Sequence, residues 1–206
     1  MNIVKLILGE LAANCYILET PEKNAVVIDP GAEAEVITEE LENRGLTLTK
    51  ILLTHGHFDH MGAAAELKER YGAQVYISAP DEELLDDKVK SVAYFLPHIP
   101  FRPVKADVRI REGDVISQDS MKISVIETPG HTAGSVCFIT EDCIFTGDTL
   151  FHGSVGRTDL FSGDAKTETE SVKRLAALEK NYKLYCGHGP DTDLDTERKF
   201  NPFIRS

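Results

Sequence analysis

The sequence predicts an α/β fold in which strands and helices alternate along one chain. Apolar runs of strand length at residues 2–8, 14–20 and 25–28 precede an acidic stretch, 33–44, whose apolar residues recur at helical spacing. A second strand–helix–strand series then covers residues 50–77. Alternation of this kind is typical of sheets and helices layered around a shared hydrophobic core.

The middle of the chain changes from regular to irregular structure. We expect a strand at 50–54, a helix at 60–71 and a strand at 74–77, followed by a short acidic helix at 81–87. The 91–105 segment then carries three prolines within seven residues, which neither a helix nor a central strand tolerates. This segment is therefore either a loop that faces a substrate or a packed crossing of the surface.

Short strands and one amphipathic helix make up the rest of the chain. The helix opens on Asp164, which has the side chain of an N-cap residue. The turn at 141–142 predicts a hairpin between the two strands on either side of it. No fixed-period repeat or linker interrupts the pattern, which favours a single domain over residues 1–206. The expected elements of this half are 121–126, 135–140, 143–146, 164–179 and 182–186.

Composition narrows the classes of partner and the cellular location. Lys and Arg number 22 against 34 Asp and Glu, a net charge of -12, which argues against nucleic acid or an anionic membrane as the main partner. The N-terminal apolar run is too short for a signal peptide, and no run approaches the roughly 20 apolar residues of a membrane span. The four cysteines form no CxxC motif, so a cytoplasmic location is expected.

The most informative stretch is THGHFDH at residues 54–60. It holds three of the seven histidines of the chain and directly follows the apolar 51–53 run. In an extended segment His55 and His57 point to the same side, while Asp59 and His60 fall in the turn that follows. This spacing of imidazoles and a carboxylate indicates metal ligands.

Three further strand ends carry a candidate ligand beside a glycine. They are His131, Asp148 and His188, whereas His98 in the proline-rich segment is not counted among the site residues. Glycine at such positions allows the backbone to approach an ion closely. Seven donors exceed what one tetrahedral ion needs and fit two ions that share a carboxylate. Imidazole with carboxylate suits zinc or iron, and manganese less well.

The motifs together resemble those of the metallo-β-lactamase-fold hydrolases. The ligand motifs are the THGHFDH run, TPGHT at 128–132, GDT at 147–149 and CGHGP at 186–190. The block 147–159 resembles the glyoxalase II-like, or hydroxyacylglutathione hydrolase-like, branch, and so do residues 14–18, Glu197 and 201–203. Only 18 residues follow His188, so the helical C-terminal domain of glyoxalase II is absent from this pattern.

The resemblance implies a four-layer αβ/βα sandwich with two divalent ions at one edge. One ion is expected on His55, His57 and His131, and the other on Asp59, His60 and His188, with Asp148 as the bridge. Asp59 is also expected to act in catalysis, by orienting the nucleophile or taking up a proton. Asp29, Arg157 and Asp159 either orient the ligands or serve as turn caps and a structural ion pair.

The expected activity is hydrolysis of a thioester, such as an S-lactoylglutathione-like compound, or of a related ester. The two ions, zinc first and iron or manganese as alternatives, would supply a hydroxide to attack the carbonyl carbon. The alternative is a mononuclear-iron persulfide dioxygenase on the same fold. The sequence assigns no substrate-binding residue and leaves the oligomeric state open.

Overall fold

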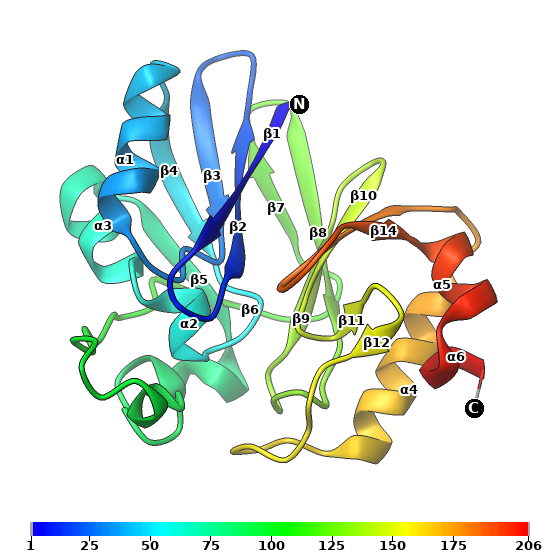
Figure 1. Cartoon of the computed structure of the whole chain (residues 1–206). Coiled ribbons are helices and arrows are strands. Elements are labelled where there is room, and N and C mark those ends of the chain that lie inside the picture. Colours follow the sequence, from blue (N-terminus) through cyan, green and yellow to red (C-terminus); the bar gives the residue numbers. More distant parts are fainter. Residues whose placement is uncertain (1, 206) are drawn as a thin grey trace.

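The computed structural model describes residues 2–205 and contains two six-stranded sheets that pack face to face (Figure 1). The first sheet has the order β1-β2-β3-β4-β5-β6. β1 to β3 are antiparallel, whereas β3 to β6 run parallel to one another. Its strands are β1 (Asn2–Leu8), β2 (Ala13–Glu19), β3 (Asn24–Ile28), β4 (Thr47–Leu52), β5 (Gln74–Ser78) and β6 (Val108–Ile110).

The second sheet has the order β14-β13-β10-β9-β8-β7, and a two-stranded ribbon, β11-β12, lies beside it. β9 and β10 pair antiparallel, which confirms the hairpin expected around residues 141–142. β10 and β13 are parallel. The strands are β7 (Val115–Gln118), β8 (Met121–Glu127), β9 (Val136–Ile139), β10 (Cys143–Gly147), β11 (Leu150–Phe151), β12 (Ser154–Val155), β13 (Lys183–Cys186) and β14 (Thr192–Asp193).

Helices cover the outer face of each sheet, so that the expected four-layer αβ/βα sandwich is confirmed. Figure 1 shows α1 and α3 on the first sheet and α4, α5 and α6 on the second. Asp164 caps α4 by accepting a hydrogen bond from the Thr167 N–H, as its side chain predicted. The helices are α1 (Ala34–Asn43), α2 (Phe58–Met61), α3 (Ala64–Tyr71), α4 (Ala165–Ala176), α5 (Leu194–Phe200) and α6 (Pro202–Arg205).

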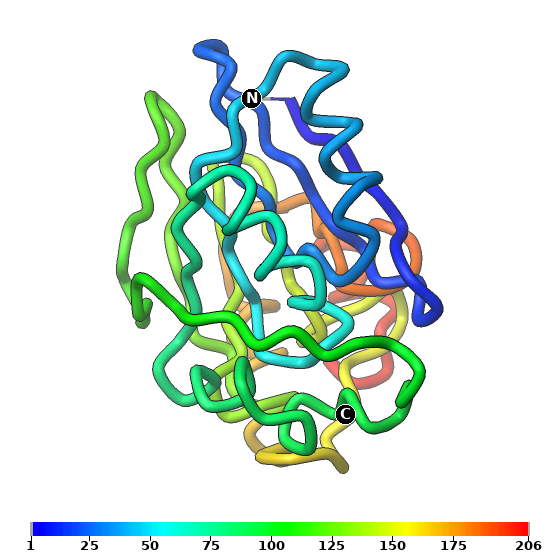
Figure 2. Tube along the Cα trace, turned by 90° about the vertical axis from the view of Figure 1, so that its left-hand side faces the viewer, coloured from blue at the N-terminus to red at the C-terminus, as the bar shows by residue number. Residues whose placement is uncertain are grey.

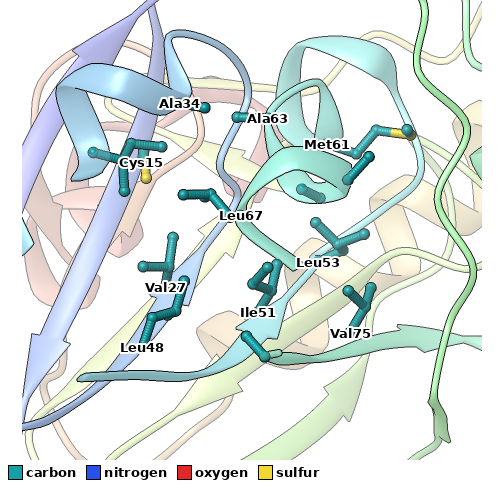
Figure 3. Packing of buried hydrophobic residues seen from close by; sticks show 14 of the residues in the cluster. Cys15, Val27, Ala34, Leu48, Ile51, Leu53, Met61, Ala63, Leu67 and Val75 are labelled. Atoms are coloured by element: carbon teal, nitrogen blue, oxygen red, sulfur yellow. The ribbon is translucent and has the colours of Figure 1, made fainter. Parts of the chain in front are cut away.

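Three apolar clusters fill the spaces between the four layers. Figure 3 shows the first cluster, where Val27, Leu48 and Ile51 of the first sheet lie against Leu67 of α3 and Ala34 of α1. A second cluster fills the space between the two sheets, and a third lies between the second sheet and α4 and α5. All four cysteines are buried and free.

The helix expected at 60–71 is in fact two helices, α2 and α3, with Gly62 and Ala63 between them. The Ala63 N–H donates to the Pro30 carbonyl, 2.9 Å away, instead of continuing a helical ladder. The turn expected at Asp59 and His60 was therefore wrong, because both residues lie in α2. Because of this break, α2, which carries Asp59 and His60, is not a continuation of α3, the helix that covers the sheet.

The 3₁₀ helix η1 (Ala79–Leu85) replaces the acidic helix expected at 81–87. A second 3₁₀ helix, η2 (Ala93–Phe95), opens the proline-rich segment. Figure 2 shows this segment, in green, crossing the lower half of the molecule. Within residues 2–205 no helix is both long enough and apolar enough to cross a membrane.

Truncation of Phe138 tests the packing between the sheets. Phe138 is fully buried in the cluster between the two sheets, so Phe138→Ala should lower the free energy of unfolding by about 3–5 kcal/mol. Val115 is 55% exposed on β7, and Val115→Ala should change it by less than about 0.5 kcal/mol. Urea unfolding at equal metal content measures both. Equal costs for the two variants would contradict this packing.

Candidate metal centre

The seven expected donors meet at one edge of the sandwich because the strands that precede them end there. β4 leads to His55 and His57, and α2 then carries Asp59 and His60. The ends of three strands of the second sheet, β8, β10 and β13, lead to His131, Asp148 and His188. The structure therefore places both halves of the donor set at the opening between the sheets.

His55, His57 and His131 form the first group of donors. One nitrogen from each ring can be chosen so that all three lie within 4.8 Å of one another. His57 Nδ1 and His131 Nε2 are 2.9 Å apart. All three side chains are almost fully buried, at 1–3% exposure. Three buried imidazoles at these distances match the ligand number of a zinc site with an open fourth position.

Asp59, His60 and His188 form the second group, within the same 4.8 Å limit. His60 Nε2 lies 3.2 Å from His188 Nε2, and His188 Nε2 lies 3.3 Å from Asp59 Oδ2. Asp148 stands between the two groups. Its Oδ1 is 3.3 Å from His60 Nε2 and its Oδ2 is 3.6 Å from His131 Nε2. This is the position of a bridging carboxylate.

Buried polar atoms without partners show that these residues fit metal ions. Among the described residues, His55 Nε2 and His57 Nε2 have no hydrogen-bond partner although both are buried. Burying such atoms unpaired costs about 1–3 kcal/mol each. The other ring nitrogen of His55 lies 3.1 Å from Thr54 Oγ1, so Nε2 remains free to bind a cation.

The charges in the two groups differ. Burial and the nearby His131 lower the pKa of His57 to about 3, so this ring is neutral and ready to act as a ligand. Burial alone would lower the pKa of His60, but Asp148, Asp59 and Asp29 raise it to about 10. The carboxylates thus create a negative potential at the second group, which favours a positive ion.

Asp29 orients His60 and the histidine-rich loop together. Its Oδ2 lies 3.1 Å from His60 Nδ1, which leaves His60 Nε2 directed toward Asp148. The same carboxylate accepts hydrogen bonds from the Thr54 N–H, at 2.8 Å, and from the Thr54 hydroxyl, at 2.6 Å. A carboxylate in this position fixes the ring and its tautomer, as is common behind metal-binding histidines.

Arg157 reaches His131 through its main chain. Its carbonyl oxygen is 2.7 Å from His131 Nδ1, so His131 Nε2 faces the other donors. The Arg157 side chain instead forms a two-point ion pair with Asp159, at 2.7 and 2.9 Å, on the surface. The side chains of Arg157 and Asp159 therefore form a structural ion pair and do not orient a ligand. Only the main-chain carbonyl of Arg157 contacts a donor residue, His131.

Two glycines allow the donor loops to come together. A Cβ atom at Gly187 would collide with Asp148 Oδ1, and one at Gly156 would overlap the Asp148 carbonyl oxygen. Any side chain at either position would push the central carboxylate away from the histidines. Glycine at the β13 end therefore allows the His188 turn to lie against Asp148.

Asp81 joins the two histidine loops. It was not identified from the sequence, where it stands in an acidic run expected to form a short helix. It is fully buried. Its carboxylate accepts hydrogen bonds from the Gly56 N–H at 2.9 Å, the Gly134 N–H at 2.8 Å and the Thr132 hydroxyl at 2.7 Å. Gly56 separates His55 from His57, and Thr132 follows His131. One side chain thus ties together the loops that carry the first group.

Two residues of β2 hold the turn that carries His188. The Asn14 side chain donates to the carbonyl oxygens of Cys186, at 2.8 Å, and Gly189, at 3.0 Å. The Tyr16 hydroxyl donates to the Cys186 carbonyl at 2.6 Å. Both residues belonged to a motif of the sequence resemblance, but their bond to the C-terminal turn requires the fold.

The donors open onto a hollow of about 430 Å³. Its walls are mainly apolar and come from α2, the proline-rich segment and the β11-β12 ribbon. Besides the histidines, Arg157 is the positively charged residue that lines the hollow. The lining residues away from the donors include Leu11, Phe58, Val92, Phe95, Phe151 and Leu160. The proline-rich segment therefore faces the site through Val92 and Phe95 and also packs on Phe58.

The four-layer sandwich and its group of metal-binding side chains are the fold and site of a metallohydrolase class. Comparison with known proteins identifies the family. The model of the metallo-beta-lactamase superfamily matches residues 8–188, a span that contains all seven donors. The chain therefore belongs to the metallo-β-lactamase superfamily. Hydroxyacylglutathione hydrolase GloC of Haemophilus influenzae is 36% identical over 212 residues, covering 100% of this chain and 99% of GloC. The resemblance to the glyoxalase II-like branch is thus confirmed.

Solved structures show the same fold over the full chain. The B3 metallo-β-lactamase BLEG-1 superposes with a TM-score of 0.92 at 33% identity and covers 100% of both chains. TTHA1623, in a di-iron-bound form, gives 0.86 at 38% identity and covers 97% of this chain and 99% of its own. ETHE1 from Myxococcus xanthus gives 0.79 at 30% identity, with coverages of 98% and 84%.

Removal of the Asp81 carboxylate should loosen the first group of donors. Asp81→Ala leaves the buried N–H groups of Gly56 and Gly134 unpaired and should cost about 2–4 kcal/mol of unfolding free energy. It should also weaken zinc binding by roughly 10–100-fold, because the ligand loops lose their shared support. Competition with a chromophoric chelator measures the affinity. Glu83→Ala, an exposed acid on the same 3₁₀ helix, is the control, and equal zinc affinity in both variants would refute the role of Asp81.

Proposed function

We propose that the protein is a binuclear metal-dependent hydrolase that cleaves a thioester, of the S-lactoylglutathione type, or a related ester. The observation that carries the proposal is the pair of donor groups with Asp148 between them. The identity to hydroxyacylglutathione hydrolase GloC supports the thioester as substrate. Zinc is the first expectation for the metal, and the di-iron form of TTHA1623 makes iron the main alternative.

The proposed ligands are His55, His57 and His131 for one ion and Asp59, His60 and His188 for the other, with Asp148 shared. Divalent ions held by these residues would lower the pKa of a bound water and polarise a substrate carbonyl. The protein's own contribution is to fix the donor geometry in an enclosed, largely apolar hollow, where electrostatic interactions are stronger than in water.

Asp59 is suited to orient the attacking water. Burial would raise the pKa of its carboxyl, but His60 and His188 outweigh burial and hold this pKa well below its usual range. The carboxylate therefore stays ionised and accepts a hydrogen bond through the reaction. Its side chain is 14% exposed and lines the hollow, so its carboxylate is accessible from there.

A thioester is a suitable substrate for a site in which few side chains are free to donate a proton to the leaving group. As water oxygen bonds to the carbonyl carbon, the C–S bond breaks and its electron pair leaves on sulfur. Thiols ionise near pH 8.5, far below alcohols, so a thiolate departs without a dedicated proton donor. The two protons of the water pass to solvent, and the departing thiolate takes one back, so the products are a carboxylate, a thiol and one released proton.

A second candidate is the mononuclear-iron persulfide dioxygenase considered from the sequence. The observation that favours it is the structural likeness to ETHE1 from Myxococcus xanthus over 98% of this chain. The two candidates differ in the number of ions and in the need for oxygen. One iron per chain with oxygen uptake on glutathione persulfide would select the dioxygenase.

Histidine substitutions test the assignment of ions to donor groups. His57→Ala and His188→Ala each remove a ligand of one group, so each should lose at least one of two ions and lower thioester kcat/KM by more than about 100-fold. His98→Ala is the matched control, because His98 is exposed and paired with Glu10. Elemental analysis and a panel of thioesters, esters and a β-lactam measure the outcome.

Retention of both ions and of turnover in His57→Ala would refute the proposed centre. Hydrolysis of the β-lactam in preference to every thioester would refute the thioester as the substrate class but would leave the proposed metal centre unchanged.

A further inference from the structure

A second cavity, of about 140 Å³, lies beside the metal centre between the β1-β2 turn and the proline-rich segment. Its walls are mostly aliphatic and aromatic. α2 forms one wall, and residues 93–102 form another. The apolar residues that line it include Leu11, Phe58, Ala93, Leu96, Ile99 and Phe101.

The charged residues at the edge of this cavity are already paired with other groups of the chain. Glu10 bonds His98 at 2.7 Å, and Glu33 accepts the Gly9 N–H at 2.8 Å. Arg102 is held by Glu66 and Glu69, at 3.2 and 2.8 Å. An anionic or cationic ligand would have to displace one of these pairs. An uncharged, apolar ligand would bury its surface against the apolar walls without displacing any of these pairs.

The cavity adjoins the metal centre. Leu11, Phe58 and Asp59 line both this cavity and the hollow over the donors. A molecule whose reacting carbonyl lies at Asp59 can therefore extend one arm into the cavity and the other into the hollow. The hollow, at about 430 Å³, is larger, so it suits the bulkier arm.

We propose that this cavity binds the acyl chain of the substrate and selects uncharged, aliphatic or phenyl acyl groups of up to about six carbons. The proposal rests on the thioesterase function proposed above. The size limit follows from volume, because an apolar cavity of about 150 Å³ holds one benzene molecule. The thiol carrier then occupies the hollow, with its sulfur near Asp59 and its remaining atoms toward Arg157 and solvent.

Acyl-chain length tests the proposal on the metal-loaded enzyme. S-acyl-N-acetylcysteamine thioesters from acetyl to decanoyl share one small, neutral thiol. The value of kcat/KM should rise about fourfold with each added methylene up to hexanoyl, because each methylene leaves water for an apolar wall. Beyond that length it should fall, since the cavity is full.

Filling the cavity should remove this preference. Ala32 is half-buried at the cavity wall, and Ala32→Leu should lower kcat/KM for hexanoyl by more than about tenfold while leaving acetyl within about twofold. Ile99→Phe, from the opposite wall, should do the same and guards against a misfolded first variant. Ala176→Leu, a half-buried alanine on α4, is the control and should keep the wild-type profile.

A binding measurement separates this proposal from the function on which it rests. Hexanol is uncharged and is not hydrolysed, and it should shift the methyl NMR signals of Ala93 and Ile99 in the wild-type protein but not in Ala32→Leu. Unshifted methyl signals, or a chain-length preference that survives both cavity variants, would each overturn the proposal. Hexanol binding without hydrolysis of any thioester would refute the thioesterase function and leave the apolar site standing.

Discussion

Imidazole nitrogens that face one another inside an apolar sandwich are the constraint on which the rest of this structure depends. The nitrogens of His57 and His131 are 2.9 Å apart, and those of His60 and His188 are 3.2 Å apart. Each pair joins a residue of the first sheet's side to one from the second. Such contacts are costly unless a proton or a cation lies between the lone pairs. The two sheets therefore meet at a site that gains most from a bound positive charge.

The residues behind the donors show how this arrangement is maintained. Asp29, Asp81 and the Arg157 carbonyl each hold a ring or a loop by hydrogen bonds from outside the donor set. Asn14 and Tyr16 reach from β2 to the turn before His188. These contacts cross from one sheet or loop to another, so the site is assembled by the tertiary structure as a whole. The β1-β2 turn also lies next to residues 93–102, and the two line the apolar cavity.

Much of this site could be predicted from the sequence, because its ligands follow apolar strands and stand beside glycines. The ends of β4, β8, β10 and β13 carry the expected donors for that reason. Asp81 could not be predicted, since nothing local distinguishes it from Glu82 and Glu83, which are at least partly exposed. The division of the 60–71 helix was also hidden, because it depends on a hydrogen bond from Ala63 to the distant Pro30. Contacts between segments far apart in the chain decide such details, and periodicity does not record them.

Anomalous X-ray scattering from crystals grown with zinc tests the central claim most directly. Data collected above and below the zinc absorption edge locate each ion independently of any activity. The account predicts two peaks per chain, one among His55, His57 and His131 and one among Asp59, His60 and His188, with Asp148 in contact with both. A single peak, or donors turned away from one another in the zinc-loaded crystal, would contradict it.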